Sequence, residues 1–338
     1  MASRLRILSI DGGGIRGYLP ALVLAEIERR SGRRAIDLFD LAAGTSTGAI
    51  ISIGLGAGLS AAELAEFYPK YGSRIFRVSE QSEWSKRLLG TGETWSERLL
   101  GPPNRIGAVF GREQQWGGNA RHSADGLESV LQEVLGDIRL SDAELPLLVT
   151  SYEADANIPV VFSSIDAAVS PETWDAKLTH VARATSAAPT YLPPAEFSWA
   201  GERHRFVDGG VWANNPAVVA MTESLKLTSA LKLTGDSIFL VSLGTGMPRS
   251  TPAFVAEASW LGSFVDVAKM ATSVTGGDVL AARALGDAYA RLQAVDDRIA
   301  GAMDDPSTSR LTALRDAAQS LIRDESAEID RIVANLVT

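Results

Sequence analysis

The sequence contains no cysteine among its 338 residues, and it has only three histidines. The absence of cysteine excludes disulfides, zinc–thiolate sites and a cysteine nucleophile, and it fits a reducing compartment. Aromatic residues are also sparse at 7%, whereas hydrophobic residues make up 46% and charged residues 22%. This composition is that of a globular protein, and it excludes disordered and fibrous classes. A chain of this length can bury a large core without covalent cross-links.

Positive charge and long hydrophobic runs are likewise in short supply. The chain has 32 Lys and Arg against 41 Asp and Glu, a net charge of −9. An acidic protein repels phosphate backbones, which argues against a nucleic-acid partner. The most apolar stretch, residues 48–59, contains four glycines and is too short to span a bilayer. The amino terminus lacks the apolar run of a signal peptide, so we expect a cytoplasmic protein.

Apolar runs and helical patterns alternate along the chain, which predicts a mostly parallel sheet with helices on both faces. Strands are predicted at Leu5–Ile10, Leu38–Ala43, Leu147–Ser151, Val160–Ser164, Arg205–Val207 and Ile238–Ser242. Helices are predicted at Pro20–Arg30, Ala49–Leu55, Ser60–Tyr71, Gly126–Leu135, Trp174–Ser186 and Pro216–Thr228. The helix that follows Ser60 carries Glu63 three residues on, the pattern of a capping box.

Two regions depart from this alternation. Residues 73–122 are rich in glycine, contain Trp84, Trp95 and Trp116, and carry eight Lys and Arg against five Glu. They are either a solvated insertion or a lid whose aromatic rings meet substrate. From Thr251 the chain is expected to be helical throughout, and it carries thirteen acidic against eight basic residues. We therefore expect a core over residues 1–250, interrupted by the insertion, and a helical cap over residues 251–338.

Glycine clusters follow three of the predicted strands, at Asp11–Gly17 (DGGGIRG), Gly44–Gly48 (GTSTG) and Asp208–Gly210 (DGG). Open α/β sheets place their functional sites at the carboxyl ends of strands. One such cluster is typical of a tight turn. Three of them in equivalent positions predict a common site.

The second cluster has the G-x-S-x-G form of a nucleophile elbow, with Ser46 at its centre. A serine on a sharp turn between strand and helix needs very small neighbours two residues away, here Gly44 and Gly48. An apolar strand precedes the cluster and a helix follows it. The start of that helix favours negative charge developing near Ser46.

The first cluster offers backbone donors. Gly12, Gly13 and Gly14 expose N–H groups without side chains in the way, and such groups at a helix start suit an oxyanion. Arg16 either supports this loop or faces the substrate.

The base that would activate Ser46 is not obviously a histidine. The three histidines are His122, His180 and His204. None of them lies in a glycine-lined setting at a strand end. Asp208 does, because it ends a predicted strand and is followed by Gly209 and Gly210. A Ser–Asp dyad is therefore the better interpretation, with burial raising the basicity of the aspartate.

The set DGGGIRG, GTSTG and DGG in this order, with ARATSAAPTYLPP at Ala182–Pro194 between the last two, resembles the patatin-like phospholipase family. The resemblance covers about residues 5–220. It implies a three-layer α/β/α fold and metal-free hydrolysis of glycerolipid acyl esters, with no cofactor. It also implies Ser46 as nucleophile, Asp208 as general base and Gly12, Gly13 and Gly14 as oxyanion hole.

The substrate that this resemblance implies is a membrane phospholipid, so a cytoplasmic member would act at membrane surfaces. The resemblance leaves open an antiviral role with a cyclic nucleotide as activator. It also leaves open assembly into a homo-oligomer.

Two alternatives belong to other functional classes. Gly12, Gly14 and Gly17 also match the dinucleotide fingerprint G-x-G-x-x-G, which would make the protein an oxidoreductase. That fingerprint needs an acid at the end of the second strand, whereas Asp37 precedes the predicted strand and Asp40 lies within it. The other alternative is a catalytically silent binding scaffold. No cluster of histidines and carboxylates in the sequence indicates a metal.

Overall fold

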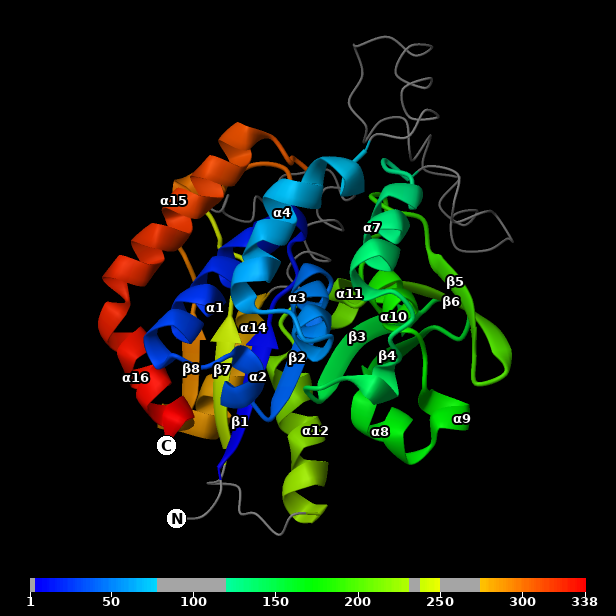
Figure 1. Cartoon of the computed structure of the whole chain (residues 1–338), viewed down its shortest axis with the longest axis horizontal. Helices are drawn as coiled ribbons and strands as arrows, with labels where there is room; N and C mark the ends of the chain where they lie inside the picture. Colours follow the sequence, from blue (N-terminus) through cyan, green and yellow to red (C-terminus); the bar gives the residue numbers. More distant parts are fainter. Residues whose placement is uncertain (1–3, 78–119, 231–237, 250–273) are drawn as a thin grey trace, which may run out of the picture.

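The protein is built around one eight-stranded sheet. The computed structural model describes residues 4–77, 120–230, 238–249 and 274–338. The strand order is β5-β6-β3-β2-β1-β7-β8, with β4 paired to β3 off this path (Figure 1). The strands are β1 (Leu5–Ile10), β2 (Leu41–Thr45), β3 (Leu147–Glu153), β4 (Ile158–Ser163), β5 (Ala195–Trp199), β6 (Glu202–Asp208), β7 (Ile238–Leu243) and β8 (Tyr289–Leu292).

The centre of the sheet is parallel and one side is antiparallel. β3, β2, β1, β7 and β8 run parallel to one another, whereas β4 and β6 pair antiparallel with β3, and β5 pairs antiparallel with β6. Parallel neighbours need crossover connections, and the helices between them supply these. The mostly parallel sheet predicted from the sequence is confirmed.

Helices cover both faces of the sheet. They are α1 (Tyr18–Ser31), α2 (Ala35–Leu38), α3 (Thr47–Gly56), α4 (Ala61–Ile75), α7 (Asp125–Leu135), α8 (Ser164–Val169), α9 (Pro171–Trp174), α10 (Leu178–Thr185), α11 (Gly210–Ala213), α12 (Ala217–Ala230), α14 (Val274–Leu285), α15 (Thr308–Asp324) and α16 (Ser326–Val337). The larger apolar core lies between one face of the strands and α1, α3, α4, α7 and α10. The smaller core lies between the other face and α12 and α14.

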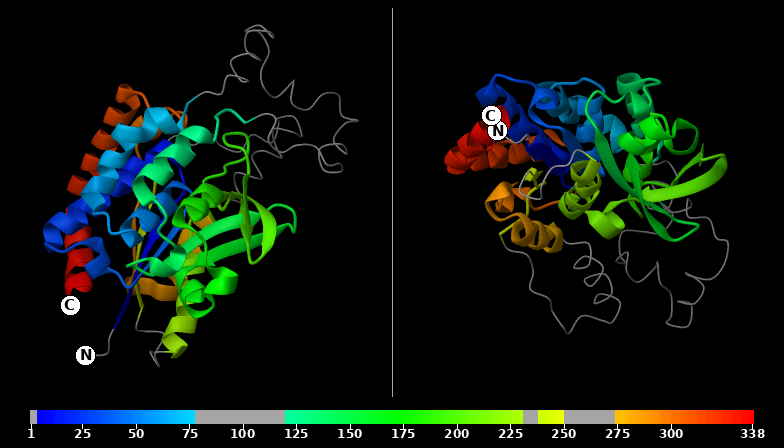
Figure 2. Two further views of the ribbon diagram at one scale, coloured as in Figure 1. Left: turned by 45° about the vertical axis from the view of Figure 1, so that its right-hand side comes forward. Right: turned by 90° about the horizontal axis from the view of Figure 1, so that it is seen from below.

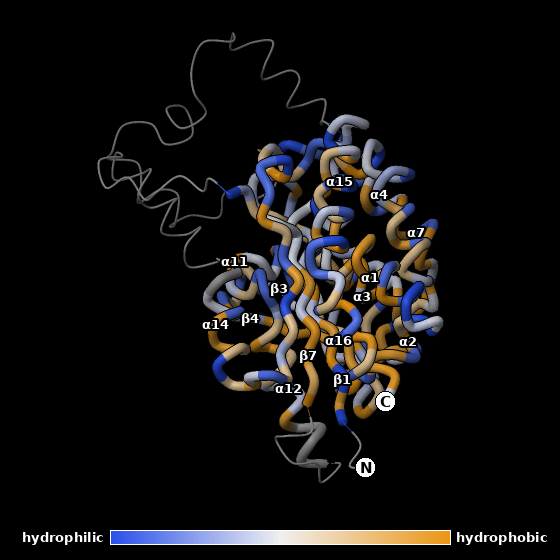
Figure 3. Tube along the Cα trace, turned by 90° about the vertical axis from the view of Figure 1, so that its left-hand side faces the viewer, coloured by the Kyte–Doolittle hydropathy of each residue, from blue (hydrophilic) through white to orange (hydrophobic). Residues whose placement is uncertain are grey.

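Alternation along a strand explains how one short segment serves both cores. Leu5 and Ile7 of β1 point into the smaller core, whereas Leu8 and Ile10 point into the larger one. Both sides of β1 are therefore apolar, as is typical of a central parallel strand. Figure 3 shows β1 and β7 as mostly hydrophobic segments inside the molecule.

Most predicted elements are present, with shifted ends. β1 has the predicted bounds, and the capping box is confirmed, since the Ser60 hydroxyl accepts from the Glu63 N–H at 3.3 Å and Glu63 accepts from the Ser60 N–H at 2.8 Å. The strand predicted from residue 38 begins at residue 41, because α2 occupies residues 35–38. The helix predicted over residues 174–186 is wrong in its first part, because the chain between α9 and α10 is extended at Asp175 and Lys177.

The expectation of a purely helical chain beyond residue 250 is wrong. Residues 289–292 form β8, which lies parallel to β7 and completes the sheet. The core therefore does not end at residue 250. α15 and α16 pack against α1 as an outer helical layer (Figure 2).

The structure describes the two ends of the insertion predicted over residues 73–122. Residues 78–119, with Trp84, Trp95 and Trp116, lie outside the described residues, so the lid stays a prediction. Among the helices of the described ranges, none combines the length and the apolar character needed to cross a membrane.

Candidate active site

The three glycine turns meet at the carboxyl edge of the sheet because of strand register. β1 and β2 are parallel, with Ile10 opposite Gly44, so the residues that follow them are neighbours. The third turn follows β6, and the pairing of β6 with β3 places it at this edge. Thr150 of β3 pairs with Thr45 of β2, and the next residue, Ser151, pairs with Asp208 of β6. β2 turns away after Thr45, and β6 takes its place along β3, which brings Asp208 to Ser46.

Ser46 lies on a strained turn between β2 and α3. Its φ of 54° and ψ of −122° are unfavourable for a residue with a side chain. The turn is tight enough that a Cβ on Gly44 would overlap the backbone of Ala49, and a Cβ on Gly48 would overlap the carbonyl of Ile10. These two glycines let strand, turn and helix pack together. The side chain of Ser46 is left half-exposed at the edge of the sheet.

Ser46 and Asp208 are joined by a short hydrogen bond. The Ser46 hydroxyl donates to Oδ2 of Asp208 at 2.6 Å, and the Gly210 N–H donates to Oδ1 at 2.7 Å. Asp208 is only 5% exposed, and burial raises the pKa of its carboxyl to about 6, against the lowering effect of these two hydrogen bonds. Gly209 has no room for a side chain because it lies against Thr150. Asp208 is thus both oriented and more basic than an exposed aspartate.

The glycine loop lies against this pair. A Cβ on Gly12 would be 3.3 Å from the Cβ of Ser46. The Gly12 N–H is already used, since it donates to the Asn214 carbonyl at 3.0 Å. Among the described residues no acceptor binds the N–H groups of Gly13 and Gly14. Of the three N–H groups expected to bind an oxyanion, those of Gly13 and Gly14 are therefore the candidates that remain.

Side chains hold the carbonyls of the same loop. The Thr245 hydroxyl donates to the Gly12 carbonyl at 2.8 Å, and Nε of Arg16 donates to the Gly13 carbonyl at 3.3 Å. The other guanidinium nitrogens of Arg16 reach the Gly246 carbonyl at 3.5 Å and the sulfur of Met303 at 3.2 Å. Of the two roles open to Arg16, these contacts are those of loop support.

A buried ion pair anchors the start of the loop. Asp11 is fully buried and accepts from both terminal nitrogens of Arg291 on β8, at 3.0 and 2.5 Å. Arg291 also donates to the Ser242 hydroxyl of β7 at 2.7 Å. Burial raises the pKa of the Asp11 carboxyl, and the charge of Arg291 partly opposes that rise. The strand absent from the sequence predictions thus holds the glycine loop in place.

The sequence predictions missed Thr245 and Arg291. A signal for Thr245 was present, because Gly244-Thr245-Gly246 is a fourth glycine turn at the end of a predicted strand, Ile238–Ser242. No local signal marks Arg291, which meets Asp11 from 280 residues away.

The histidines are engaged elsewhere. Nε2 of His122 lies 2.8 Å from Oδ2 of Asp304, and Nε2 of His204 lies 3.1 Å from the Trp199 carbonyl. The His180 ring is stacked on Phe197, with the ring centroids 4.8 Å apart. Within the described chain, none of the three hydrogen-bonds to Ser46 or Asp208.

The acid required for a dinucleotide site is at the opposite edge of the sheet. Asp40 precedes β2 and pairs with Arg6 of β1 at 2.7 Å. The carboxyl end of β2, where such an acid would meet a ribose, is occupied by Ser46 instead. Within residues 4–77, 120–230, 238–249 and 274–338, no three His, Asp or Glu side chains gather as a metal-binding group.

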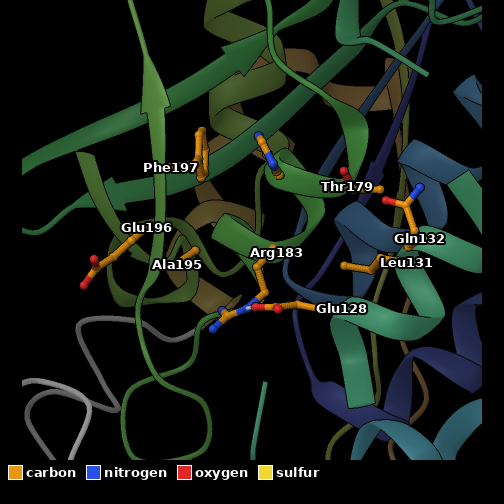
Figure 4. Close-up of a pocket in the computed structure, with 9 residues that line it drawn as sticks. Glu128, Leu131, Gln132, Thr179, Arg183, Ala195, Glu196 and Phe197 are labelled. Atoms are coloured by element: carbon orange, nitrogen blue, oxygen red, sulfur yellow. Dashed lines mark hydrogen bonds and ion pairs between the residues drawn. The ribbon is translucent and has the colours of Figure 1, made fainter. Parts of the chain in front are cut away.

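A pocket of about 260 Å³ lies apart from the dyad, between α7, α10 and β5 (Figure 4). Its lining residues are Glu128, Leu131, Gln132, Thr179, His180, Arg183, Ala195, Glu196 and Phe197. Arg183 is bound within it by Glu128 at 2.9 Å and by the Pro193 carbonyl at 2.7 Å. Neither Ser46 nor Asp208 is among the residues that line this pocket.

A family model described as patatin-like phospholipase matches residues 8–221. Patatin-17 of Solanum cardiophyllum is 30% identical over 273 residues, which cover 73% of this chain and 61% of the relative. Patatin-like protein 3 of Arabidopsis thaliana is 31% identical over 284 residues, which cover 74% and 61%. The chain thus spans about three fifths of the length of these relatives.

A solved structure, human GIVD cytosolic phospholipase A2, is 12% identical with a TM-score of 0.41. The superposition covers 98% of this chain and 60% of that one.

Proposed function

The chain belongs to the patatin-like phospholipase family, and we propose that it is a serine lipid acyl hydrolase that cleaves fatty-acyl esters of glycerophospholipids. The substrate would be a membrane phospholipid, met by the protein at the membrane surface. The observation that carries this proposal is the 2.6 Å hydrogen bond from Ser46, on a strained turn, to the buried carboxylate of Asp208. The nearby glycine loop adds the amides of Gly13 and Gly14, for which no described residue is an acceptor. A scaffold without activity would need none of these features.

In the first half of the reaction, Asp208 acts as general base. Its Oδ2 accepts the proton of Ser46 as the serine oxygen attacks the ester carbonyl carbon. The carbonyl oxygen becomes negatively charged, and the N–H groups of Gly13 and Gly14 would stabilise it. Donors of this kind are worth about 3–4 kcal/mol each to the transition state. The carbon–oxygen bond to the glycerol then breaks, the departing alkoxide takes the proton from Asp208, and the acyl group stays on Ser46.

In the second half, water replaces the alcohol. Asp208 accepts a proton from the water as its oxygen attacks the acyl carbon, and the same two amides stabilise the second oxyanion. The bond to Ser46 breaks, the serine oxygen recovers the proton, and a fatty acid is released. One carboxylate thus serves both steps, and this fits a pKa raised to about 6, close to neutral pH.

Hydrolysis of a short-chain chromogenic ester and of a phospholipid, each measured for the wild type and for Ser46→Ala with EDTA present, tests this proposal. We expect the wild type to release product from both substrates and the variant from neither. Hydrolysis by Ser46→Ala at the wild-type rate would remove Ser46 from the mechanism. A wild type inactive on both substrates would favour the silent scaffold.

A further inference from the structure

We propose that Thr245 is a positioning residue for catalysis, whose hydroxyl keeps the Gly13 N–H directed at the oxyanion. This inference rests on the proposed acyl transfer at Ser46. Thr245 lies in the turn after β7, beyond residues 8–221 that match the family model.

The geometry of one peptide group supports this role. The carbonyl of Gly12 and the N–H of Gly13 belong to the same planar peptide and point in opposite directions. The Thr245 hydroxyl fixes the carbonyl from one side at 2.8 Å. The N–H is therefore directed to the other side, and no described residue accepts from it. Gly12 itself lies against Ser46, so we infer that the Gly13 N–H is available to a group bound beside the Ser46 hydroxyl.

The loop needs such an external hold because of its composition. Three consecutive glycines have more backbone freedom than any other tripeptide, and no side chain of their own restricts them. Gly13 leaves no space for a side chain either, since a Cβ there would lie 2.7 Å from the Cβ of Thr245. The hydroxyl of Thr245 thus approaches the backbone closely and restricts rotation of the peptide group between Gly12 and Gly13.

Thr245 is itself held rigidly. It is 3% exposed, and both of its neighbours are tied to the chain around β8. The Gly244 N–H donates to the Leu292 carbonyl at 2.9 Å, and the Gly246 N–H donates to Oε1 of Gln293 at 3.0 Å. A fixed donor can hold a flexible loop, whereas a mobile one could not. The carboxyl-terminal part of the sheet would in this way orient the amino-terminal glycine loop.

The test compares Thr245→Val, which keeps the shape and removes the hydroxyl, with Thr245→Ser, which keeps the hydroxyl. The readout is the rate at which a fluorophosphonate modifies Ser46, followed by intact mass, because this reagent forms a tetrahedral adduct whose oxygen occupies the oxyanion position. Loss of one oxyanion donor costs about 10²–10³ in rate. We expect Thr245→Val to react about 10- to 100-fold more slowly, and Thr245→Ser to stay within about threefold of the wild type.

Steady-state hydrolysis of the chromogenic ester separates positioning from a structural role. We expect Thr245→Val to lower kcat/KM and to leave the midpoint of its pH profile where it is in the wild type. Equal modification rates for the valine variant and the wild type would overturn the inference. So would a shifted midpoint, because it would mean that Thr245 acts on Asp208.

Two further outcomes are distinguishable. If Thr245→Val does not fold, Thr245→Ala offers a smaller side chain without the hydroxyl, and loss of folding in both would show a purely structural role and overturn the inference. If the wild type itself is not modified at Ser46, the proposed function fails first, and the role of Thr245 fails with it.

Discussion

Replacement of Asp208 by asparagine should stabilise the folded protein at neutral pH while it abolishes hydrolysis. Burial raises the pKa of this carboxyl from 3.8 to about 6. At 1.36 kcal/mol for each tenfold change in proton affinity, holding the carboxylate ionised in the fold costs about 3 kcal/mol. Asparagine has the same shape, keeps an acceptor for the Gly210 N–H and carries no charge. It should therefore remove this cost.

The sign of the effect depends on pH in a defined window. The folded state binds the Asp208 proton more tightly than the unfolded state does, so the wild type loses stability as pH rises from about 4 to about 6. Above that window the cost is fully present, and below it the cost is absent. The free energy of unfolding of Asp208→Asn should exceed that of the wild type by about 3 kcal/mol at pH 8 and by little at pH 4.

Urea unfolding of both proteins between pH 4 and pH 8 measures this difference. Glu202→Gln is the matched control, because Glu202 is an exposed carboxylate on the same strand, β6. We expect the control to show no comparable pH-dependent gain. A difference between Asp208→Asn and the wild type that stays constant across this range, or a loss of stability at pH 8, would refute the reasoning from burial.

Three further predictions concern the same site. For the wild type, kcat/KM should fall about tenfold for each pH unit below 6, because only the ionised carboxylate of Asp208 accepts a proton. A flat profile from pH 4 to 8 would exclude Asp208 as the base. Gly48→Ala should cost at least 1–3 kcal/mol of stability in urea unfolding, as its Cβ overlaps the backbone of β1, whereas Gly276→Ala, in open space on α14, should not destabilise. Arg291→Met should cost about 3–5 kcal/mol by leaving Asp11 buried without a partner, and combining it with Asp11→Asn should recover part of that loss; strictly additive losses would count against the ion pair.

Local patterns were sufficient for the parts of the fold with strong periodicity. β1 has apolar residues at four of its six positions, and the capping box at Ser60 combines two residue types at a fixed spacing, so both were predictable from sequence. The clustering of the first two glycine turns also followed, because β1 and β2 are parallel and end at the same edge of the sheet. The third turn reaches that edge for a different reason, since β6 runs antiparallel to β3 and pairs with its last residues. The 2.6 Å contact between Ser46 and Asp208 therefore depends on the pairing of β6 with β3.

The remaining features depend on contacts between distant parts of the chain. β8 has four residues, one of them an arginine, so it gives no apolar run, and its pairing with β7 is what makes it a strand. The contact of Arg291 with Asp11 is likewise set by sheet order. The use of the Gly12 N–H by the Asn214 carbonyl could not be predicted from a glycine pattern. It leaves Gly13 and Gly14 as the glycines of this loop whose N–H groups have no acceptor among the described residues.

The most direct test of the central claim is to locate the acyl group during turnover. The protein is mixed with an excess of a p-nitrophenyl ester, quenched in acid within the first turnovers and digested, and the peptides are analysed by mass spectrometry. The account predicts an acyl group on the peptide that contains Ser46 in the wild type, and none in Ser46→Ala or Asp208→Asn. An acyl group on a different residue, or undiminished hydrolysis by Ser46→Ala, would contradict it.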